Sequence, residues 1–357
     1  MDLPRPKPRP AIERMAAYHP PSSGRAGKLR LDFNENTVGA SPRVVSKLQQ
    51  VLSADALTVY PEYTEVLPAL ARFFEVAEDE LILTNGTDEA IQVLINAYVD
   101  NDDDVLILTP SYAMYRFYSE VAGARVRTLP YKPDTLKFPL EELLAAIRPT
   151  TKAILISNPN NPTGTALKRE GIERILDKAP EAAVLIDEAY FEFCGITMLP
   201  YLNEYPNLFV SRTFSKVYGM AALRVGCLFS CAENMAALHK SHSPYSVNYL
   251  AAIAARAAIE DTAYLKSFVT EVLAAREVLT AGLEKLGVPY VPSQANFVLM
   301  HIGPRAQEVC DRLKLEGILV RNRGYEIPGA VRVTVGTQEQ TRRFLTALAP
   351  LWQEIQR

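Results

Sequence analysis

Short runs of consecutive apolar residues recur along the middle of the chain, and each ends in a polar residue. The runs are Leu81–Thr84, Val105–Thr109, Ala153–Ser157, Val184–Asp187 and Leu208–Ser211. Because the apolar positions are continuous rather than alternating, they are typical of strands buried on both faces of a sheet. Helical periodicity lies between several of them, over Thr87–Val99, Tyr112–Ala122 and Lys168–Lys178. This alternation predicts an α/β fold with a mainly parallel, doubly wound sheet.

The pattern changes after about residue 244. Residues 246–286 are mostly helical, and a closing helix begins near Gln338. Between them lie three short strand candidates, Asn296–His301, Ile318–Arg321 and Val331–Val335. We therefore expect a large domain over residues 41–245 and a smaller α/β domain over residues 246–357. Residues 1–40 are expected to form an N-terminal arm and part of the small domain.

The first ten residues, MDLPRPKPRP, are rich in proline and basic residues, which predicts an extended or frayed arm rather than a signal segment. The longest stretch without a charged residue, Leu286–Pro304, contains three prolines and several polar residues. Its pattern is that of strand, turn and strand, so we expect no membrane span.

Composition excludes several classes of protein. Hydrophobic residues make up 48% of the 357 residues and charged residues 22%, as in globular proteins. The net charge of −3 gives no basic excess for a nucleic-acid partner. Four scattered cysteines and four dispersed histidines favour neither a disulfide framework nor a metal site. Buried, reduced cysteines indicate a cytoplasmic protein.

Polar clusters follow four of the strand candidates, at the edge where open α/β sheets bind ligands. After the first comes NGTDEA, where Gly86 permits a tight turn and Thr87 can cap a helix whose free amides would bind an anion. Asp88 and Glu89 add negative charge there, which opposes a phosphate. The turn therefore fits an ordinary helix cap as well as an anion site that draws cations from elsewhere.

The other three clusters add an amide, a carboxylate and two cations. NPNNPTG is a rigid loop that presents Asn161, although turn chemistry alone also accounts for it. Asp187 ends a buried strand and needs a cationic partner there. The last cluster, RTFSKVYGMAALRVG, supplies Lys216 and Arg224.

Together these clusters resemble the class I and II aminotransferases, which use pyridoxal 5'-phosphate on the fold type I scaffold. Within them the chain is most similar to the histidinol-phosphate aminotransferase group. The resemblance runs from about Tyr18 to the last helix. Its segments are LDFNENTVGASP, VYPEY, NGTDEAI, TPSYAMY, SNPNNPTG, IDEAYFEF, RTFSKVYG and RVTVGT.

The resemblance implies a role for each residue around the cofactor. Lys216 would form a Schiff base with it and then shuttle a proton at the substrate α-carbon. Asp187 would face the protonated ring nitrogen and keep the ring an electron sink. Tyr190 and Asn161 would hydrogen-bond the ring oxygen, and Tyr112 would stack on the ring face, with core packing as the alternative for Tyr112.

The phosphate of the cofactor would lie at the Gly86 turn. Its implied contacts are the amides of Thr87 and Asp88, the hydroxyls of Thr213 and Ser215, and the guanidinium of Arg224, whose planar fork suits phosphate oxygens. In the family an aromatic residue of the neighbouring subunit also reaches this phosphate. Tyr60 occupies that motif here, which implies a homodimer.

On the substrate side, Arg332 matches the residue that binds the anionic end of the substrate. Arg321 and Tyr18 resemble further phosphate contacts, and Arg323 stays an alternative to Arg321. Asn36 belongs to the motif N-E-N-P, in which Thr37 replaces the proline here, and is expected at the substrate. The residues Val217, Ala222 and Cys227 also depart from the family pattern near the cofactor loop.

The resemblance implies transamination between histidinol phosphate and 2-oxoglutarate in histidine biosynthesis. An aromatic amino-acid aminotransferase and a threonine-phosphate decarboxylase are the alternatives among enzymes. A transcription regulator built on such a domain would need a DNA-binding module, and the arm before Leu31 is too short for one.

Overall fold

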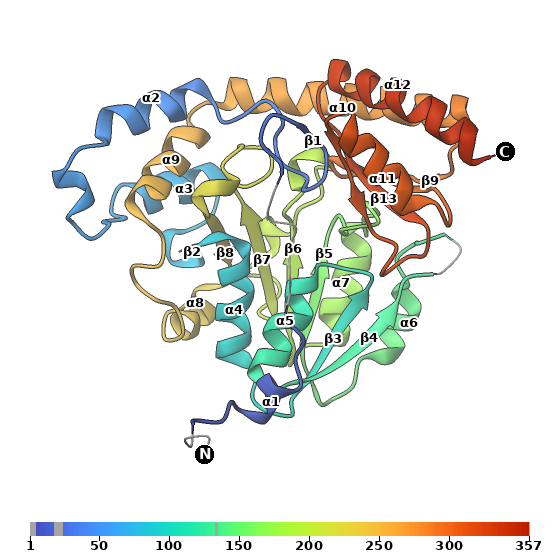
Figure 1. Cartoon of the computed structure of the whole chain (residues 1–357). Coiled ribbons are helices and arrows are strands. Elements are labelled where there is room, and N and C mark those ends of the chain that lie inside the picture. The colour runs from blue at the N-terminus through green and yellow to red at the C-terminus, as the bar shows by residue number, and fades with distance from the viewer. Residues whose placement is uncertain (1–4, 18–23, 133–134, 357) are drawn as a thin grey trace.

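A seven-stranded sheet forms the centre of the computed structural model, which describes residues 5–17, 24–132 and 135–356 (Figure 1). The strand order is β2-β8-β7-β6-β5-β3-β4, and only β8 runs antiparallel to its neighbours. The strands are β2 Leu81–Thr84, β3 Asp104–Thr109, β4 Arg125–Pro130, β5 Thr151–Ser157, β6 Ala183–Asp187, β7 Leu208–Thr213 and β8 Gly226–Phe229. The predicted α/β fold with a mainly parallel sheet is confirmed.

Helices cover both faces of this sheet, which explains the continuous apolar runs. Alternate strand residues such as Val105 and Ile107 pack on one face, while Leu106 and Leu108 pack on the other. The first face is covered by α4 Gly86–Tyr98, α5 Ala113–Ala122 and α8 Ala232–Leu238. The second is covered by α3 Val66–Phe74, α6 Leu140–Ala146 and α7 Arg169–Lys178. The strands other than the edge strand β4 therefore bury apolar side chains in two separate layers.

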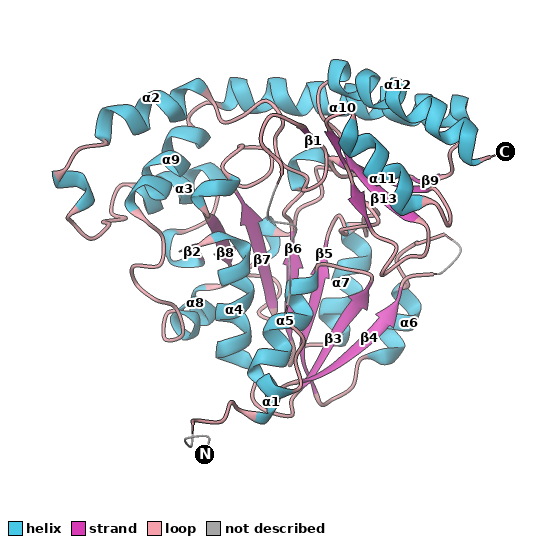
Figure 2. Ribbon diagram, viewed as in Figure 1, coloured by secondary structure: helices cyan, strands magenta, loops and turns pink. Residues whose placement is uncertain are grey.

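A smaller antiparallel sheet of order β12-β13-β10-β9 follows in the sequence (Figure 2). Its strands are β9 Tyr290–Val291, β10 Phe297–His301, β12 Arg321–Asn322 and β13 Ala330–Thr334. The accompanying helices are α10 Thr262–Leu286, α11 Ala306–Leu315 and α12 Gln338–Ile355. In Figure 2 the parallel strands of the large sheet point toward this part of the molecule.

The N-terminal segment joins this second unit through β1 Leu29–Arg30, which pairs in parallel with β11 Ile318–Leu319. Helix α2 Pro42–Val51 and helix α3 both pack against α9 Tyr249–Ile259. Short 3-10 turns complete the described chain at Asp55–Leu57, Glu78–Glu80, Phe191–Phe193, Leu199–Tyr201 and Ala221–Leu223. The domain boundaries at residues 40 and 245 stay a prediction.

Of the ten residues expected to form an extended or frayed arm, Pro10 is instead helical. It begins the short helix α1 Pro10–Glu13, which packs against α5 and buries Ala11. Proline at the first helical position suits this turn, since its missing N–H would have no partner there. Among the described residues, no helix is both long enough and apolar enough to cross a membrane.

Candidate active site

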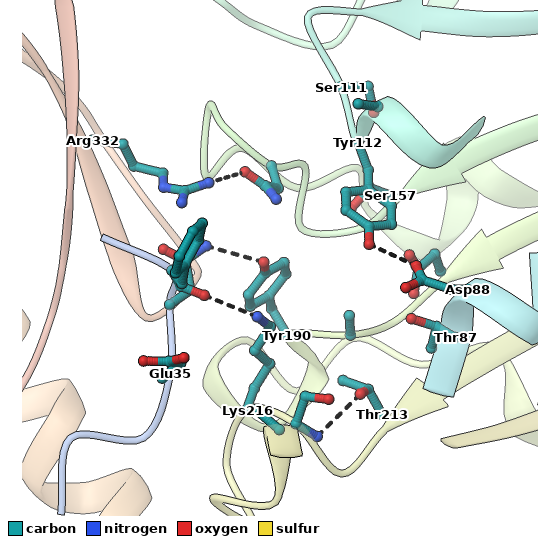
Figure 3. A pocket seen from close by; sticks show the side chains of 18 of the residues that line it. Glu35, Thr87, Asp88, Ser111, Tyr112, Ser157, Tyr190, Thr213, Lys216 and Arg332 are labelled. Atoms are coloured by element: carbon teal, nitrogen blue, oxygen red, sulfur yellow. Dashed lines mark hydrogen bonds between the residues drawn. The ribbon is translucent and has the colours of Figure 1, made fainter. Parts of the chain in front are cut away.

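A cavity of about 440 Å³ lies at the carboxyl ends of the large sheet's strands (Figure 3). Residues at the ends of β2, β6 and β7 line one side of it, and the segment 33–35 and strands β12 and β13 line the other. Most residues singled out in the sequence meet here. They are Thr87, Asp88, Tyr112, Asn161, Asp187, Tyr190, Thr213, Ser215, Lys216, Arg224, Arg321 and Arg332.

Asp187, the last residue of β6, is a buried carboxylate without a cationic partner among the described residues. It accepts hydrogen bonds from the hydroxyls of Tyr115, at 2.7 Å, and Ser211, at 2.9 Å. Burial raises the pKa of Asp187 to about 6, although both hydroxyls act in the opposite direction. An anion held in this way fits the protonated ring nitrogen of a pyridine cofactor, which would supply the missing positive charge.

The turn after β2 forms the end of the cavity that suits a phosphate. Helix α4 begins at Gly86 with Asn85 as its N-cap, so the expectation that Thr87 caps the helix is wrong. Thr87 and Asp88 instead lie in the first turn, where backbone N–H groups lack partners within the helix. Gly86 has a φ angle of 76°, which favours glycine, and a Cβ there would lie 2.6 Å from Nη2 of Arg224 and so displace that guanidinium.

Arg224 balances the negative charge that Asp88 brings to this turn. Its Nη2 lies 3.1 Å from Oδ2 of Asp88, and its Nη1 lies 3.5 Å from the Ser215 hydroxyl. The hydroxyl of Tyr112 donates to the other oxygen of Asp88 at 2.7 Å. Burial raises the pKa of Tyr112, and the negative charge of Asp88 adds to that rise, so the phenol stays neutral. The Asp88 carboxylate is thus bound on both oxygens.

Lys216 lies on the loop after β7, and its Nζ donates to the carbonyl oxygen of Phe33 at 3.0 Å. Next to it, Nδ2 of Asn34 donates to the Tyr190 hydroxyl at 3.0 Å (Figure 3). Sequence reasoning did not single out Phe33 or Asn34. Both stand in the quoted segment LDFNENTVGASP, but their contacts are with residues more than 150 positions away.

Two arginines of the small sheet, Arg332 and Arg321, differ in how many hydrogen-bond or ion-pair partners they already have. Arg332 is buried; its guanidinium donates to the carbonyl oxygen of Asp32 at 2.7 Å and to the side-chain oxygen of Asn161, while its Nε has no partner among the described residues. Burial, together with the neighbouring cations Arg323 and Arg321, lowers the pKa of Arg332 to about 10.

Arg321 and Arg323 differ in their ion-pair partners. Arg323 forms an ion pair with Glu326. The guanidinium of Arg321 lies 5.5 Å from the ring centre of Phe33 and makes no ion pair within the described part of the chain. Arg25 lies over the same ring at 4.3 Å and binds the carboxylates of Asp32 and Glu35. Arg321 is therefore the cation of this group that is available to a ligand.

The remaining expected site residues lie elsewhere. Asn36 does not line the cavity, because its Nδ2 donates to the carbonyl of Val217 at 2.9 Å and its Oδ1 accepts from the amides of Val38 and Gly39. Tyr60 is 75% exposed and stacks on Tyr245 with ring centres 4.8 Å apart. Tyr18 lies outside the described residues.

The sequence analysis did not predict the buried ion pair of Arg212 and Glu188 next to the cavity. Arg212 of β7 donates from Nε to the Glu188 carboxylate at 2.8 Å, and Nη2 lies 2.7 Å from the same oxygen. The guanidinium also lies 3.5 Å from the ring centre of Phe191. The pair joins the end of β6, which carries Asp187, to the end of β7, which precedes the loop with Lys216.

Comparison with known proteins gives consistent results. The family model described as aminotransferase class I and II matches residues 26–348. The chain is 36% identical to a histidinol-phosphate aminotransferase of Symbiobacterium thermophilum, covering 95% of this chain and 97% of the relative. It is 34% identical to one of Halalkalibacterium halodurans, covering 91% and 89%.

Solved structures resemble the whole fold. A histidinol-phosphate aminotransferase from Sinorhizobium meliloti, in complex with pyridoxal-5'-phosphate, superposes with a TM-score of 0.85 at 25% identity, covering 97% of both chains. A structure described as a putative histidinol-phosphate aminotransferase from Erwinia carotovora atroseptica gives a TM-score of 0.85 at 26% identity. That match covers 95% of this chain and 99% of the other.

Proposed function

The chain belongs to the class I and II aminotransferase family, and we propose that it transfers the amino group of histidinol phosphate to 2-oxoglutarate. The products would be imidazole acetol phosphate and glutamate, as in histidine biosynthesis. The main support for the proposal is one cavity that contains Lys216 and the buried carboxylate of Asp187, which has no cationic partner among the described residues. Arg321 and Arg332 line the substrate side of the same cavity. The cofactor of the enzyme is pyridoxal 5'-phosphate.

When bound, pyridoxal phosphate withdraws electrons from the α-carbon of the substrate and so makes its proton removable. The residues that would hold it surround the cavity on different sides. Asp187 would pair with the ring nitrogen, Tyr112 would lie against the ring face, and Asn161 and Tyr190 would bind the ring oxygen. The phosphate contacts would be Thr87, Asp88, Thr213, Ser215 and Arg224.

Lys216 would attach the cofactor and then move the proton at the substrate α-carbon. Its Nζ is held by the carbonyl of Phe33, whose oxygen only accepts hydrogen bonds. That bond orients the amine without supplying a proton to it. The loop after β7 therefore carries the proton-transferring group.

Arg321 and Arg332 support a substrate with an anionic end. Charge-assisted hydrogen bonds from a guanidinium are strong and match the oxygens of a phosphate or carboxylate. Arg321 has no ion pair within the described residues, so a phosphate would not have to displace an existing carboxylate. The same pocket would accept the carboxylate of 2-oxoglutarate, because both ligands present oxygens to the same cations.

The homodimer is supported by an apolar surface around Tyr60. Leu57, Val59, Tyr60 and Tyr245 are all more than half exposed, and a contiguous exposed apolar group of this kind marks an interaction site. We propose that a second copy of the chain covers it and that Tyr60 then reaches the phosphate end of the neighbouring cavity. Tyr60 does not line the cavity of its own chain.

A half-reaction screen tests the substrate. The cofactor-loaded enzyme is mixed separately with histidinol phosphate, phenylalanine, tyrosine and threonine phosphate, and conversion of the cofactor to its amine form is followed by absorbance. We expect histidinol phosphate to convert it fastest. No conversion by histidinol phosphate would reject this substrate, and release of carbon dioxide from threonine phosphate would favour the decarboxylase.

Lys216→Ala tests the reaction itself. We expect this variant to lose turnover by several orders of magnitude, because no other described lysine lines the cavity. It should also lose the visible absorbance band of the covalently held cofactor. Lys240→Ala, a substitution of an exposed lysine outside the cavity, is the matched control and should retain both. Normal turnover in Lys216→Ala would remove this residue from its proposed role.

A further inference from the structure

Asn34 is a buried residue held in an unusual backbone conformation beside the cavity. Only 1% of its surface is exposed, and its φ angle is 57°, in the left-handed region. Asparagine tolerates this conformation better than most residues. The segment is fixed on its outer side, since the Asn34 carbonyl accepts from Nδ2 of Asn296 at 3.1 Å and Leu31 pairs with the backbone of Thr334. Asn34 is thus held rigidly.

The hydrogen bonds around Asn34 fix which way its amide points. The backbone N–H of Asn34 donates to the Thr334 hydroxyl oxygen at 3.0 Å. Because an N–H only donates, the single hydrogen of Thr334 remains free, and it is donated to Oδ1 of Asn34 at 3.2 Å. A flipped amide would leave that buried hydrogen without an acceptor. Nδ2 therefore faces Tyr190.

This orientation also determines where the hydrogen of Tyr190 goes. A phenol has one hydrogen to donate, and its oxygen here accepts from Nδ2 of Asn34 at 3.0 Å. The amide nitrogen does not accept, so the Tyr190 hydrogen cannot be used in that bond. No other group among the described residues accepts it, and Tyr190 lines the cavity. Its hydrogen is left for a ligand in the cavity.

We propose that Asn34 is a positioning residue that directs the hydroxyl hydrogen of Tyr190 toward the ring oxygen of the bound cofactor. The inference rests on the proposed function, because it takes Tyr190 as a contact of that oxygen. The neighbouring Phe33 carbonyl binds Nζ of Lys216, so two consecutive residues of one segment orient two functional groups (Figure 3).

Two substitutions separate the direction of the hydrogen bond from its presence. Asn34→Gly removes the donor, and glycine adopts a positive φ without strain. Asn34→Asp also tolerates this conformation but introduces a carboxylate that only accepts. Tyr190 would then donate to the new carboxylate and present only lone pairs to the cavity. Each variant is also made in a Tyr190→Phe background, where no hydroxyl remains to be directed.

The readouts are the pH at which the bound cofactor changes colour and the dissociation constant for pyridoxal phosphate. A hydrogen bond donated to the ring oxygen favours its anionic form, so losing that bond makes the bound cofactor hold its proton more tightly. We expect the midpoint to rise by about one pH unit in Tyr190→Phe, as for the loss of a charge-assisted hydrogen bond. Asn34→Asp should raise it at least as far, and Asn34→Gly should raise it less.

The two backgrounds make the proposal falsifiable. In Tyr190→Phe, the further change Asn34→Gly should leave the midpoint unmoved, and Asn34→Asp should add only the effect of its charge. Equal shifts in both backgrounds, or no shift with Asn34→Gly and Asn34→Asp in the wild-type background, would overturn the positioning role. Thermal unfolding checks that each variant is folded. The wild-type half-reaction, measured separately, tests the proposed function, so the two failures are distinguishable.

Discussion

Tyr115 and Asp187 form a fully buried hydrogen bond of 2.7 Å beneath the cavity. The hydroxyl stabilises the ionised carboxylate, which is the form that would pair with the ring nitrogen of the cofactor. With a pKa of about 6, Asp187 takes up a proton as the pH falls through 6, and cofactor affinity should fall with it. Tyr115→Phe removes the donor, raises this pKa and should move the loss of affinity to a higher pH.

The measurement is the dissociation constant for pyridoxal phosphate between about pH 5 and pH 8. The phosphate of the cofactor titrates alike in every variant, so the difference from wild type isolates Asp187. Tyr131→Phe is a matched control, because the Tyr131 hydroxyl is also buried but has no hydrogen-bond partner among the described residues. A shift of the same size in both variants would contradict a specific role for Tyr115.

Arg321 and Arg323 lie two residues apart but should respond differently to substitution. Arg321→Gln removes an unpaired cation, so we expect KM for histidinol phosphate to rise about 10- to 100-fold. Histidinol, which lacks the phosphate, should be affected little. Arg323→Gln leaves the carboxylate of Glu326 without its partner and should lower thermal stability rather than change the preference for the phosphate. Kinetics with both donors would show the reverse if Arg323 binds the phosphate.

Single residues were predictable from the sequence where one motif carries its own chemistry. Asp187 ends β6, Lys216 and Arg224 come after β7, and the three side chains meet in one cavity as expected. Asn34 and Tyr115 were not predictable, because their roles depend on partners that are distant in the sequence. For Asn36 the motif alone misplaced the side chain, since an amide binds a backbone carbonyl as readily as a ligand.

At the scale of elements, the ends of β6 and β7 are joined by the buried pair Glu188 and Arg212. Arg212→Met leaves a buried carboxylate without its cation, which costs about 3–5 kcal/mol of unfolding free energy. The exposed pair of Arg174 and Glu141 provides the control, and Arg174→Ala should cost less than about 1 kcal/mol. Urea unfolding of both variants measures the difference. Equal losses would show that the buried pair adds nothing specific.

In the large sheet, β2 matches the predicted strand, and β3, β5, β6 and β7 extend their predictions by one or two residues. The prediction of one strand over Ile318–Arg321 is wrong, because these residues are divided between β11 and β12, which belong to different sheets. Strands β4 and β8 were not predicted. β4 is an edge strand whose residues are only partly buried, so it lacks a continuous apolar run. β8 is only four residues long and follows directly on the segment that was interpreted as a cofactor loop. A continuous apolar run therefore identifies a strand only where it is present, as it is not in β4, and where it is separate from a neighbouring motif, as it is not in β8.

At the scale of the whole molecule, the sequence predicts an α/β architecture because strand and helix alternate, but it does not determine how two chains assemble. The apolar residues Leu57, Val59 and Tyr60 are exposed on the single chain, and hydrophobicity alone does not identify what covers them. Assembly therefore needs its own experiment. We expect the purified protein to elute as a dimer in size-exclusion chromatography, and Tyr60→Ala to weaken cofactor binding.

Mixing two impaired variants decides whether Tyr60 acts across the interface. Lys216→Ala subunits lack the amine that is proposed to react but retain Tyr60. Tyr60→Ala subunits retain that amine but lack Tyr60. In a mixed dimer, the site built around the intact Lys216 would receive Tyr60 from its neighbour and be complete, while the second site would lack both groups. We therefore expect activity above that of either pure variant after unfolding and refolding the two together. If Tyr60 served its own chain, every site in the mixture would lack one group, and activity would not exceed the average of the separate samples.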